Sequence, residues 1–261
     1  MLESFDVFGL DVKTFGLFFA LNFVAWGAIV SVRLRELGRP ADWAWEMVFV
    51  ALAGGFLGAR LYWILDNWDE VEGDVLGNIF SGSGLTWYGG LAGGALAMVV
   101  WARRRDFLGV HLFDIAAFGL PIGYAIGRIG CQISGDGDYG KAWDGPWSMP
   151  YPDGAVPTSD DVHPTPIYET LAMGTVGLLL WHLRDRVRPG GLFALYLLFA
   201  GAERFLVEFL RRNEETVAGL TTAQVTAAAL FVAGAVMAMI YQRRGGLLLS
   251  PGPRAPRSAT A

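Results

Sequence analysis

Arg128 stands in a stretch whose residue types could bind a polar ligand inside a membrane. The stretch, GRIGCQISGDGDYG, covers residues 127–140 and follows a long apolar run. A guanidinium cannot be deprotonated, and a charge at membrane depth costs at least about 2.5 kcal/mol, so such a residue usually marks a polar ligand or pathway. We expect a helix to end here in an irregular Gly- and Asp-rich segment, with a lipid head group as the ligand.

Arg204 is the second guanidinium that interrupts an apolar run, and its neighbours allow two interpretations. Arg204, Glu208 and Arg212 stand four residues apart, on one face of a helix. Glu208 could therefore neutralise Arg204 as an ordinary intrahelical pair, or it could orient a ligand-binding arginine. Arg60 is also open to two interpretations, a structural ion pair with Asp114 or a supporting position near the site.

The elements that must position these charges are apolar enough to cross a membrane. Of 261 residues, 53% are hydrophobic and 17% are charged. Because a membrane-crossing helix needs about 20 apolar residues, the runs predict seven transmembrane helices. Three runs are uncharged: residues 14–32, 75–102 and 221–241. Four carry isolated charges: residues 47–65, 110–126, 167–183 and 190–210.

Basic residues in the short loops predict the orientation. Most of the 20 Lys and Arg residues follow the first, third, fifth and seventh runs. Cytoplasmic loops are enriched in such residues, so we expect the N-terminus outside and the C-terminus inside. Arg211 and Arg212 are the exception. The acidic leader before Lys13 argues against a cleaved signal peptide.

The chain is predicted to be all-α, a polytopic membrane protein with one membrane domain over residues 1–244. Residues 128–166 form the one connection long enough for an extracytoplasmic loop or cap. Residues 245–261, rich in Pro, Arg and Ser, read as a disordered cytoplasmic tail. No nucleic-acid signature is present. Glycines four residues apart predict close helix packing, for example Gly54 with Gly58 and Gly89 with Gly93.

An ordered set of motifs resembles the bacterial prolipoprotein diacylglyceryl transferase family, from near the N-terminus to about Tyr241. GLTWYGGLAGG is similar to the family's HGGL element, and GRIGCQISGDGDYG to its GRxGNFxNGE signature. VHPTPIYE, AERFLVEFLRR and LTTAQ follow in the family's order. No single motif is decisive, but the ordered set on seven spans is specific.

The resemblance implies a reaction and its partners. The diacylglyceryl group of phosphatidylglycerol would pass to the thiol of a lipobox cysteine in an exported prolipoprotein, forming a thioether and releasing glycerol 1-phosphate. It implies a multi-pass protein of the bacterial cytoplasmic (inner) membrane, with its site toward the outer face. It implies neither a cofactor nor a metal ion.

Site residues follow from the resemblance, position by position. Arg128 and Arg204 match arginines that the family uses, Arg128 at the lipid phosphate. Fixed guanidinium groups suit a departing phosphate in a poorly hydrated cavity. Gly89 and Gly90 could let the backbone approach a head group.

The residue that would accept the thiol proton is not identified by the motifs, because Tyr88 stands where the family has histidine. A phenol with a pKa near 10 suits a hydrogen-bond donor better than a base. His163 has the best ordinary pKa for proton transfer at neutral pH, although it could be a solvated loop residue. Asp136, Asp138 and Glu169 are the other candidates for the base, although Glu169 is interpreted first as the orienting partner of an arginine.

Other departures from the family's motifs alter the polar residues predicted to surround the head group. Cys131 replaces an asparagine, Ser134 replaces a second asparagine, and Asp136 replaces a glutamate. Ser134 and Asp136 keep hydrogen-bonding and charge, whereas Cys131 reads as a small packing residue. Two competing interpretations are a degenerate relative that binds anionic lipid without transferring it and an unrelated transporter. A retinal photoreceptor is excluded because the chain's two lysines, Lys13 and Lys141, lie outside the last run.

Overall fold

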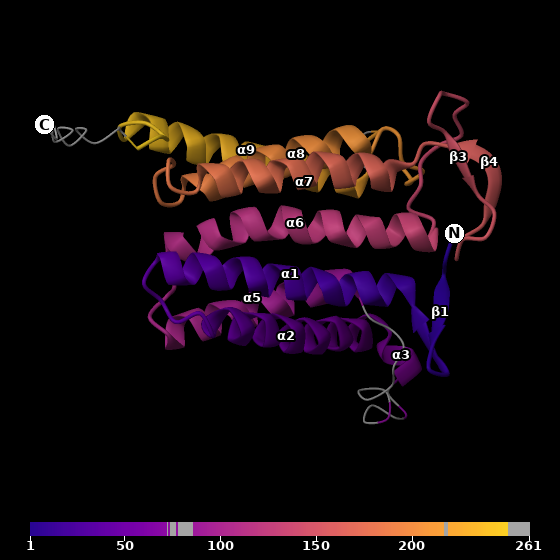
Figure 1. Ribbon diagram of the computed structural model, residues 1–261, viewed down its shortest axis with the longest axis horizontal. Coiled ribbons are helices and arrows are strands. Elements are labelled where there is room, and N and C mark those ends of the chain that lie inside the picture. The colour runs from indigo at the N-terminus through magenta and orange to yellow at the C-terminus, as the bar shows by residue number, and fades with distance from the viewer. Residues whose placement is uncertain (72, 74–76, 78–85, 217–218, 250–261) are drawn as a thin grey trace, which may run out of the picture. The chain divides into compact units, whose positions relative to one another are not determined.

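The computed structural model describes residues 1–71, 73, 77, 86–216 and 219–249 (Figure 1). Among these, four helices are long and apolar enough to cross a membrane: α1 (Thr14–Glu36), α2 (Trp43–Asp66), α6 (Val110–Ser134) and α9 (Thr222–Arg243). The other long helices are α5 (Trp87–Arg104), α7 (Thr165–Leu183) and α8 (Gly191–Val207). A single turn, α3 (Trp68–Val71), follows α2.

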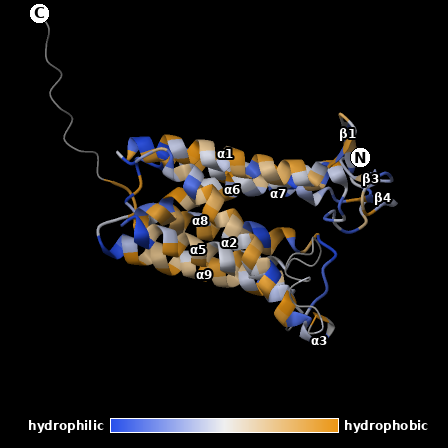
Figure 2. Ribbon diagram, turned by 90° about the horizontal axis from the view of Figure 1, so that it is seen from below, coloured by the Kyte–Doolittle hydropathy of each residue, from blue (hydrophilic) through white to orange (hydrophobic). Residues whose placement is uncertain are grey.

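These helices agree with the predicted helical membrane class. Each of the seven apolar runs falls on one long helix, although residues 75–76 and 78–85 of the third run lie outside the described residues. Figure 2 shows the long helices as mostly hydrophobic along their length, with strongly hydrophilic residues toward their ends and in the connections. The number of spans and the orientation stay predictions.

Helix α6 extends further than the sequence indicated. The expected change from helix to irregular chain at Arg128 is wrong, because α6 continues through Arg128 to Ser134. It ends where Gly135 adopts a φ of +62°, a conformation that glycine reaches without a steric penalty. A Cβ on Gly135 would also lie 2.7 Å from the Cα of Gly154. Arg128 is therefore held rigidly, nearly two turns before the end of a helix.

The chain divides into two compact units, of which one is Phe19–Ile115. In this unit α2 and α5 pack through their glycines. A Cβ added to Gly58 or Gly93 would collide with the backbone of the opposite helix. The prediction of close packing is thus confirmed at these positions, where small residues let two backbones meet.

The other unit combines Met1–Phe18 with Ala116–Ala261. Helices α8 and α9 lie side by side (Figure 1), and a Cβ on Gly201 would come within 2.7 Å of the Ala227 carbonyl oxygen. The Thr170 hydroxyl of α7 donates to the Ala125 carbonyl oxygen of α6 over 3.3 Å. Because α7 contacts both α6 and α8, side chains from the three helices can meet.

Two small sheets occupy the connections at one end of this unit (Figure 1). Strands β1 (Ser4–Val7) and β2 (Leu10–Lys13) form an antiparallel hairpin, and β3 (Met149–Tyr151) pairs with β4 (Thr158–Val162). The predicted loop over residues 128–166 therefore contains helix and sheet. Its own small core is formed by Tyr139, Tyr151 and Val162.

Main-chain hydrogen bonds tie this connection to the helix ends. The Gly140 amide donates to the His163 carbonyl oxygen, and the Lys141 amide donates to the Leu210 carbonyl oxygen, each over 2.8 Å. The start of the loop thus lies against both the entry to α7 and the segment after α8.

Candidate functional site

Glu169 lies at the centre of a buried charged cluster. Its side chain has no exposed surface, and it contacts arginines from three segments. Its Oε2 lies 2.6 Å from Arg128 Nε on α6, and its Oε1 lies 3.5 Å from Arg204 Nη1 on α8 and 3.4 Å from Arg211 Nη1 just after α8. The structure therefore brings together Arg128, Arg204 and Glu169, which the sequence placed on separate helices.

Glu208 fixes the second side of the cluster. Its Oε2 lies 2.8 Å from Arg204 Nη2, which confirms the predicted pair four residues apart. Its Oε1 accepts hydrogen bonds of 2.7 Å from both Asn213 and the Thr221 hydroxyl. Thr221 is also the N-cap of α9, in a capping box with Gln224. The start of α9 thus helps to set the position of Arg204.

Asp138 closes the cluster from the loop. It forms ion pairs with Arg128 and Arg211, and its main-chain oxygen accepts a 2.6 Å hydrogen bond from Thr165 at the start of α7. Burial raises the pKa of Asp138, but Arg128 and Arg211 outweigh that effect and hold the pKa below its ordinary value. Asp138 therefore stays ionised at neutral pH.

The cluster balances three guanidinium groups against three carboxylates, yet one donor is unused. Arg204 Nη1 is buried, and its 3.5 Å contact with Glu169 Oε1 is an ion pair without hydrogen-bond geometry, so this atom makes no hydrogen bond among the described residues. A buried donor without an acceptor costs about 1–3 kcal/mol, and a further anionic oxygen would remove that cost.

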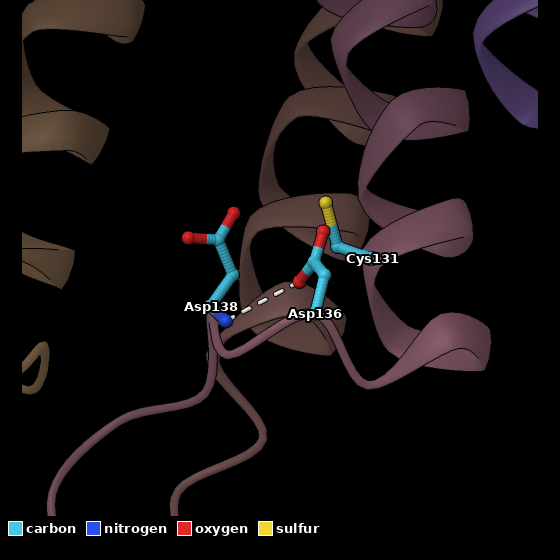
Figure 3. Close-up of side chains that lie close together, drawn as sticks. All are labelled: Cys131, Asp136 and Asp138. Carbon is cyan, nitrogen blue, oxygen red and sulfur yellow. Dashed lines mark hydrogen bonds between the residues drawn. The ribbon is translucent and has the colours of Figure 1, made fainter. Parts of the chain in front are cut away.

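Cys131, Ser134 and Asp136 lie around the end of α6. Figure 3 shows Cys131 beside Asp136 and Asp138, and the ligand atoms of these three residues lie within 4.8 Å of one another. The Asp138 amide donates to the Asp136 carboxylate over 3.3 Å. Two arginines already bind the Asp138 carboxylate, so its charge is compensated without a metal ion. The Ser134 hydroxyl, which is buried, donates to the Cys131 carbonyl oxygen of its own helix.

His163 lies in the loop before α7, outside the ion pairs. Its ring stacks on Trp143 with centroids 4.3 Å apart, and its Nδ1 lies 3.3 Å from the Tyr168 hydroxyl. Partial burial lowers the pKa of His163 below its ordinary value. The lowered pKa favours the neutral imidazole, and the role of His163 as a base stays a prediction.

Four further candidate site residues belong to the other compact unit, Phe19–Ile115. Tyr88 is 55% exposed on the first turn of α5. Gly89 packs against Gly58 of α2, and Gly90 approaches the Gly55 carbonyl oxygen. Arg60 is 5% exposed, with its guanidinium 4.5 Å from the ring centroid of Trp63. A role for these four residues at the lipid stays a prediction.

Arg211 and Thr221 are members of the cluster that the sequence interpretation did not select. Arg211 is the central residue on the loop side, since it contacts Asp138, Glu169 and Glu208. The sequence did contain an indication of this role for Arg211, because Arg211 and Arg212 were the exception to the predicted distribution of basic residues. Charged residues close to apolar segments commonly pair with residues of opposite charge, as Arg211 does here.

The fold and the cluster together define a class, that of a helical membrane protein with a buried cluster of arginines and carboxylates. Comparison with known proteins gives the family. The model of the prolipoprotein diacylglyceryl transferase family matches residues 3–240, and the chain belongs to this family.

Similar proteins span nearly the same length. A phosphatidylglycerol–prolipoprotein diacylglyceryl transferase of Dehalococcoides mccartyi is 32% identical over 92% of this chain and 93% of its own. Proteins of the same name are 28% identical in Clostridium tetani, over 84% and 89% of the two chains, and 29% identical in Mannheimia succiniciproducens, over 92% of each. The resemblance found in the motifs is thereby confirmed.

Proposed function

We propose that this protein transfers the diacylglyceryl group of phosphatidylglycerol to the thiol of a lipobox cysteine in an exported prolipoprotein. A carbon–sulfur bond forms at the diacylglyceryl carbon, and the bond from that carbon to the phosphate oxygen breaks. The thiol proton is lost to a base, and the leaving phosphate is protonated and departs as glycerol 1-phosphate. The family and the names of its similar members support this reaction.

The observation that carries the proposal for the site is the pair of arginines around Glu169. Arg128 and Arg204 contact opposite oxygens of this one carboxylate, and Arg204 Nη1 makes no hydrogen bond among the described residues. A phosphate oxygen at this point would receive the unused hydrogen bond and lie beside both guanidinium groups. Fixed donors of this kind stabilise charge on a leaving phosphate without reorganising.

The carboxylates and loop residues have supporting roles in this scheme. Glu169 and Glu208 hold the arginines in place, and because Glu169 contacts three cations it is poorly suited to accept the thiol proton. A thiol with an ordinary pKa near 8.5 needs only modest help. His163 is the base in this proposal, with Tyr88 as a hydrogen-bond donor to a substrate oxygen. Ser134 and Asp136 belong to the proposed substrate site, and the family resemblance alone supports substrate-binding roles for Gly89, Gly90 and Arg60 of the other unit.

The proposed setting is the cytoplasmic (inner) membrane of a bacterium. The seven long helices would cross the bilayer with the N-terminus outside, as one domain over residues 1–244. Arg-rich connections after α1, α5, α7 and α9 support this orientation. The cluster lies near the C-terminal ends of α6 and α8, away from these Arg-rich connections. In this orientation it would face the outer surface, where an exported thiol arrives.

The test supplies purified protein with labelled phosphatidylglycerol and a lipobox peptide. We expect a lipidated peptide from the unmodified protein and about 100-fold less from Arg128→Lys, since an ammonium does not reproduce the planar guanidinium fork. Arg243→Lys, at the far end of α9, is the matched control and should retain activity. Lipid binding without product would refute the transfer reaction, and normal turnover by Arg128→Lys would remove this residue from the phosphate.

A further inference from the structure

Glu203 is a carboxyl group on α8 that the charged cluster does not use. Its Oε1 is buried and makes no hydrogen bond among the described residues. Glu203 also forms no ion pair with any residue in the part of the chain that the structure describes. Buried polar atoms in proteins are normally hydrogen-bonded, so an oxygen left without a partner at membrane depth indicates a missing ligand or an added proton.

Two further polar atoms near Glu203 are buried in the same condition. They are Arg204 Nη1, on the next residue of α8, and the Tyr124 hydroxyl on α6. The Tyr124 ring centroid lies 4.9 Å from the Arg128 guanidinium, and Tyr124 interacts electrostatically with both Glu203 and Glu169. Three polar atoms without hydrogen bonds, from two helices, therefore gather beside the central carboxylate of the cluster, as the wall of a site for one polar ligand would.

The charge balance of the cluster favours a protonated Glu203. The three arginines of the cluster are already paired with three carboxylates. A fourth carboxylate would leave one buried negative charge unpaired, and Glu169 would repel it. A buried charge without a partner costs several kcal/mol, so the group takes up a proton instead.

The other neighbours of Glu203 supply no countercharge. Tyr196, two turns earlier on α8, interacts electrostatically with Glu203, but a phenol is neutral or negative and never positive. Helix α9 packs against α8 and has no titratable side chain before Tyr241. Glu203 is thus expected to be a neutral carboxylic acid, which can donate both a hydrogen bond and a proton.

Glu203 is one residue from the atom at which the proposed function places a phosphate oxygen. That oxygen would accept a hydrogen bond from Arg204 Nη1, and both side chains interact with Glu169. A carboxylate here would repel the phosphate, whereas a carboxylic acid would donate a hydrogen bond to it. When the bond to carbon breaks, the phosphate gains a second negative charge, and a phosphate monoester takes up its second proton at about pH 6. An acid beside the phosphate therefore stabilises the leaving group as its charge develops.

We propose that Glu203 is the general acid of the transfer reaction and gives its proton to the leaving phosphate. The inference rests on the proposed function, which requires a proton donor at this step and does not name one. The thiolate electron pair forms the carbon–sulfur bond, and the pair of the breaking carbon–oxygen bond passes to the phosphate oxygen, which takes the proton from Glu203. Glu203 is left as a carboxylate beside Arg204. It regains, through solvent, the proton that the thiol gave to His163, so the cycle neither gains nor loses a proton.

Glu203→Gln tests the proton donor, because the amide keeps the shape and neutrality of a carboxylic acid but has no acidic proton. We expect kcat to fall about 100-fold or more, as loss of a general acid typically causes. The KM for phosphatidylglycerol and the unfolding temperature should stay close to those of the unmodified protein. Glu214→Gln, at an exposed carboxylate, is the matched control and should keep its kcat. A normal kcat in Glu203→Gln, or a change in KM alone, would overturn the inference.

The conservative variant Glu203→Asp separates an acid from a hydrogen-bond donor. Aspartate keeps the acidic proton on a side chain one methylene shorter, whereas glutamine keeps the length and loses the proton. We expect Glu203→Asp to retain more of kcat than Glu203→Gln. The opposite order would show that length and hydrogen bonding matter at this position and proton transfer does not, which would overturn the inference.

Infrared spectroscopy separates this inference from the proposed reaction. The C=O stretch of a protonated carboxylic acid is distinct from the bands of a carboxylate, and it can be measured at neutral pH without substrate. The unmodified protein should show such a band that Glu203→Gln lacks. Product from labelled phosphatidylglycerol and a lipobox peptide without this band would overturn Glu203 as the acid and leave the reaction standing. The band without any product would refute the transfer reaction instead.

Discussion

Replacing Glu169 with glutamine should destabilise the protein strongly. Glu169 is fully buried and neutralises parts of three arginines, with contacts of 2.6 to 3.5 Å. Glutamine keeps the shape but removes the charge, and its amide would direct hydrogens at guanidinium donors. Removing one partner of a buried ion pair costs about 3–5 kcal/mol. A kcal/mol lowers the unfolding temperature of a protein this size by about 2–4 °C, so we expect a fall of roughly 6–20 °C.

The assay is thermal unfolding in detergent, followed by the fluorescence of the chain's 10 tryptophans. Glu214→Gln is the matched control, because it makes the same change at an exposed carboxylate three residues after Arg211. That variant should unfold close to the unmodified protein. If Glu169→Gln unfolds no lower than Glu214→Gln, the central place of Glu169 in the charge balance is refuted.

Three further changes test other parts of the site. Asp138→Asn should lower the unfolding temperature most at neutral pH. Because folding lowers the pKa of Asp138, its ionised form stabilises the protein above the unfolded pKa near 4, and this stabilisation is lost as the pH falls. A difference in unfolding temperature between the two proteins that is constant from pH 3 to 7 would contradict this reasoning. Thr221→Val removes the N-cap of α9 and a hydrogen bond to Glu208 and should cost about 1–2 kcal/mol in unfolding measurements, whereas Thr221→Ser should restore stability. Tyr88→Phe should reduce the transfer rate only a few-fold, and loss of all product would show that its hydroxyl is essential.

The charged residues within apolar runs were the part of the site that the sequence could reveal. Arg128, Arg204, Glu169 and Glu208 are costly in a membrane unless they meet, and this cost alone predicts that they gather. The long helices were predictable for a similar reason, since an apolar run of sufficient length has few alternatives to a helix in a bilayer.

The loop was less accessible to prediction because its path has no periodic pattern. Asp138 reaches the cluster only because the chain turns at Gly135 and Gly137 and is then fixed by hydrogen bonds to residues far along the sequence. The stacking of Trp143 on His163 depends on the same path. Likewise, the helical continuation to Ser134 is decided by packing against neighbours that a local pattern does not report.

The distribution of the cluster over α6, α7 and α8 bears on how the protein enters its membrane during synthesis. Arg128 leaves the ribosome first, Glu169 about forty residues later, and Arg204 and Arg211 after that. Helix α7 contains no arginine or lysine of its own, so a chain halted after α7 would pair Glu169 with Arg128 alone. We therefore expect stable insertion of the middle helices to require Arg204 and Arg211, and truncated chains to be more sensitive to proteolysis.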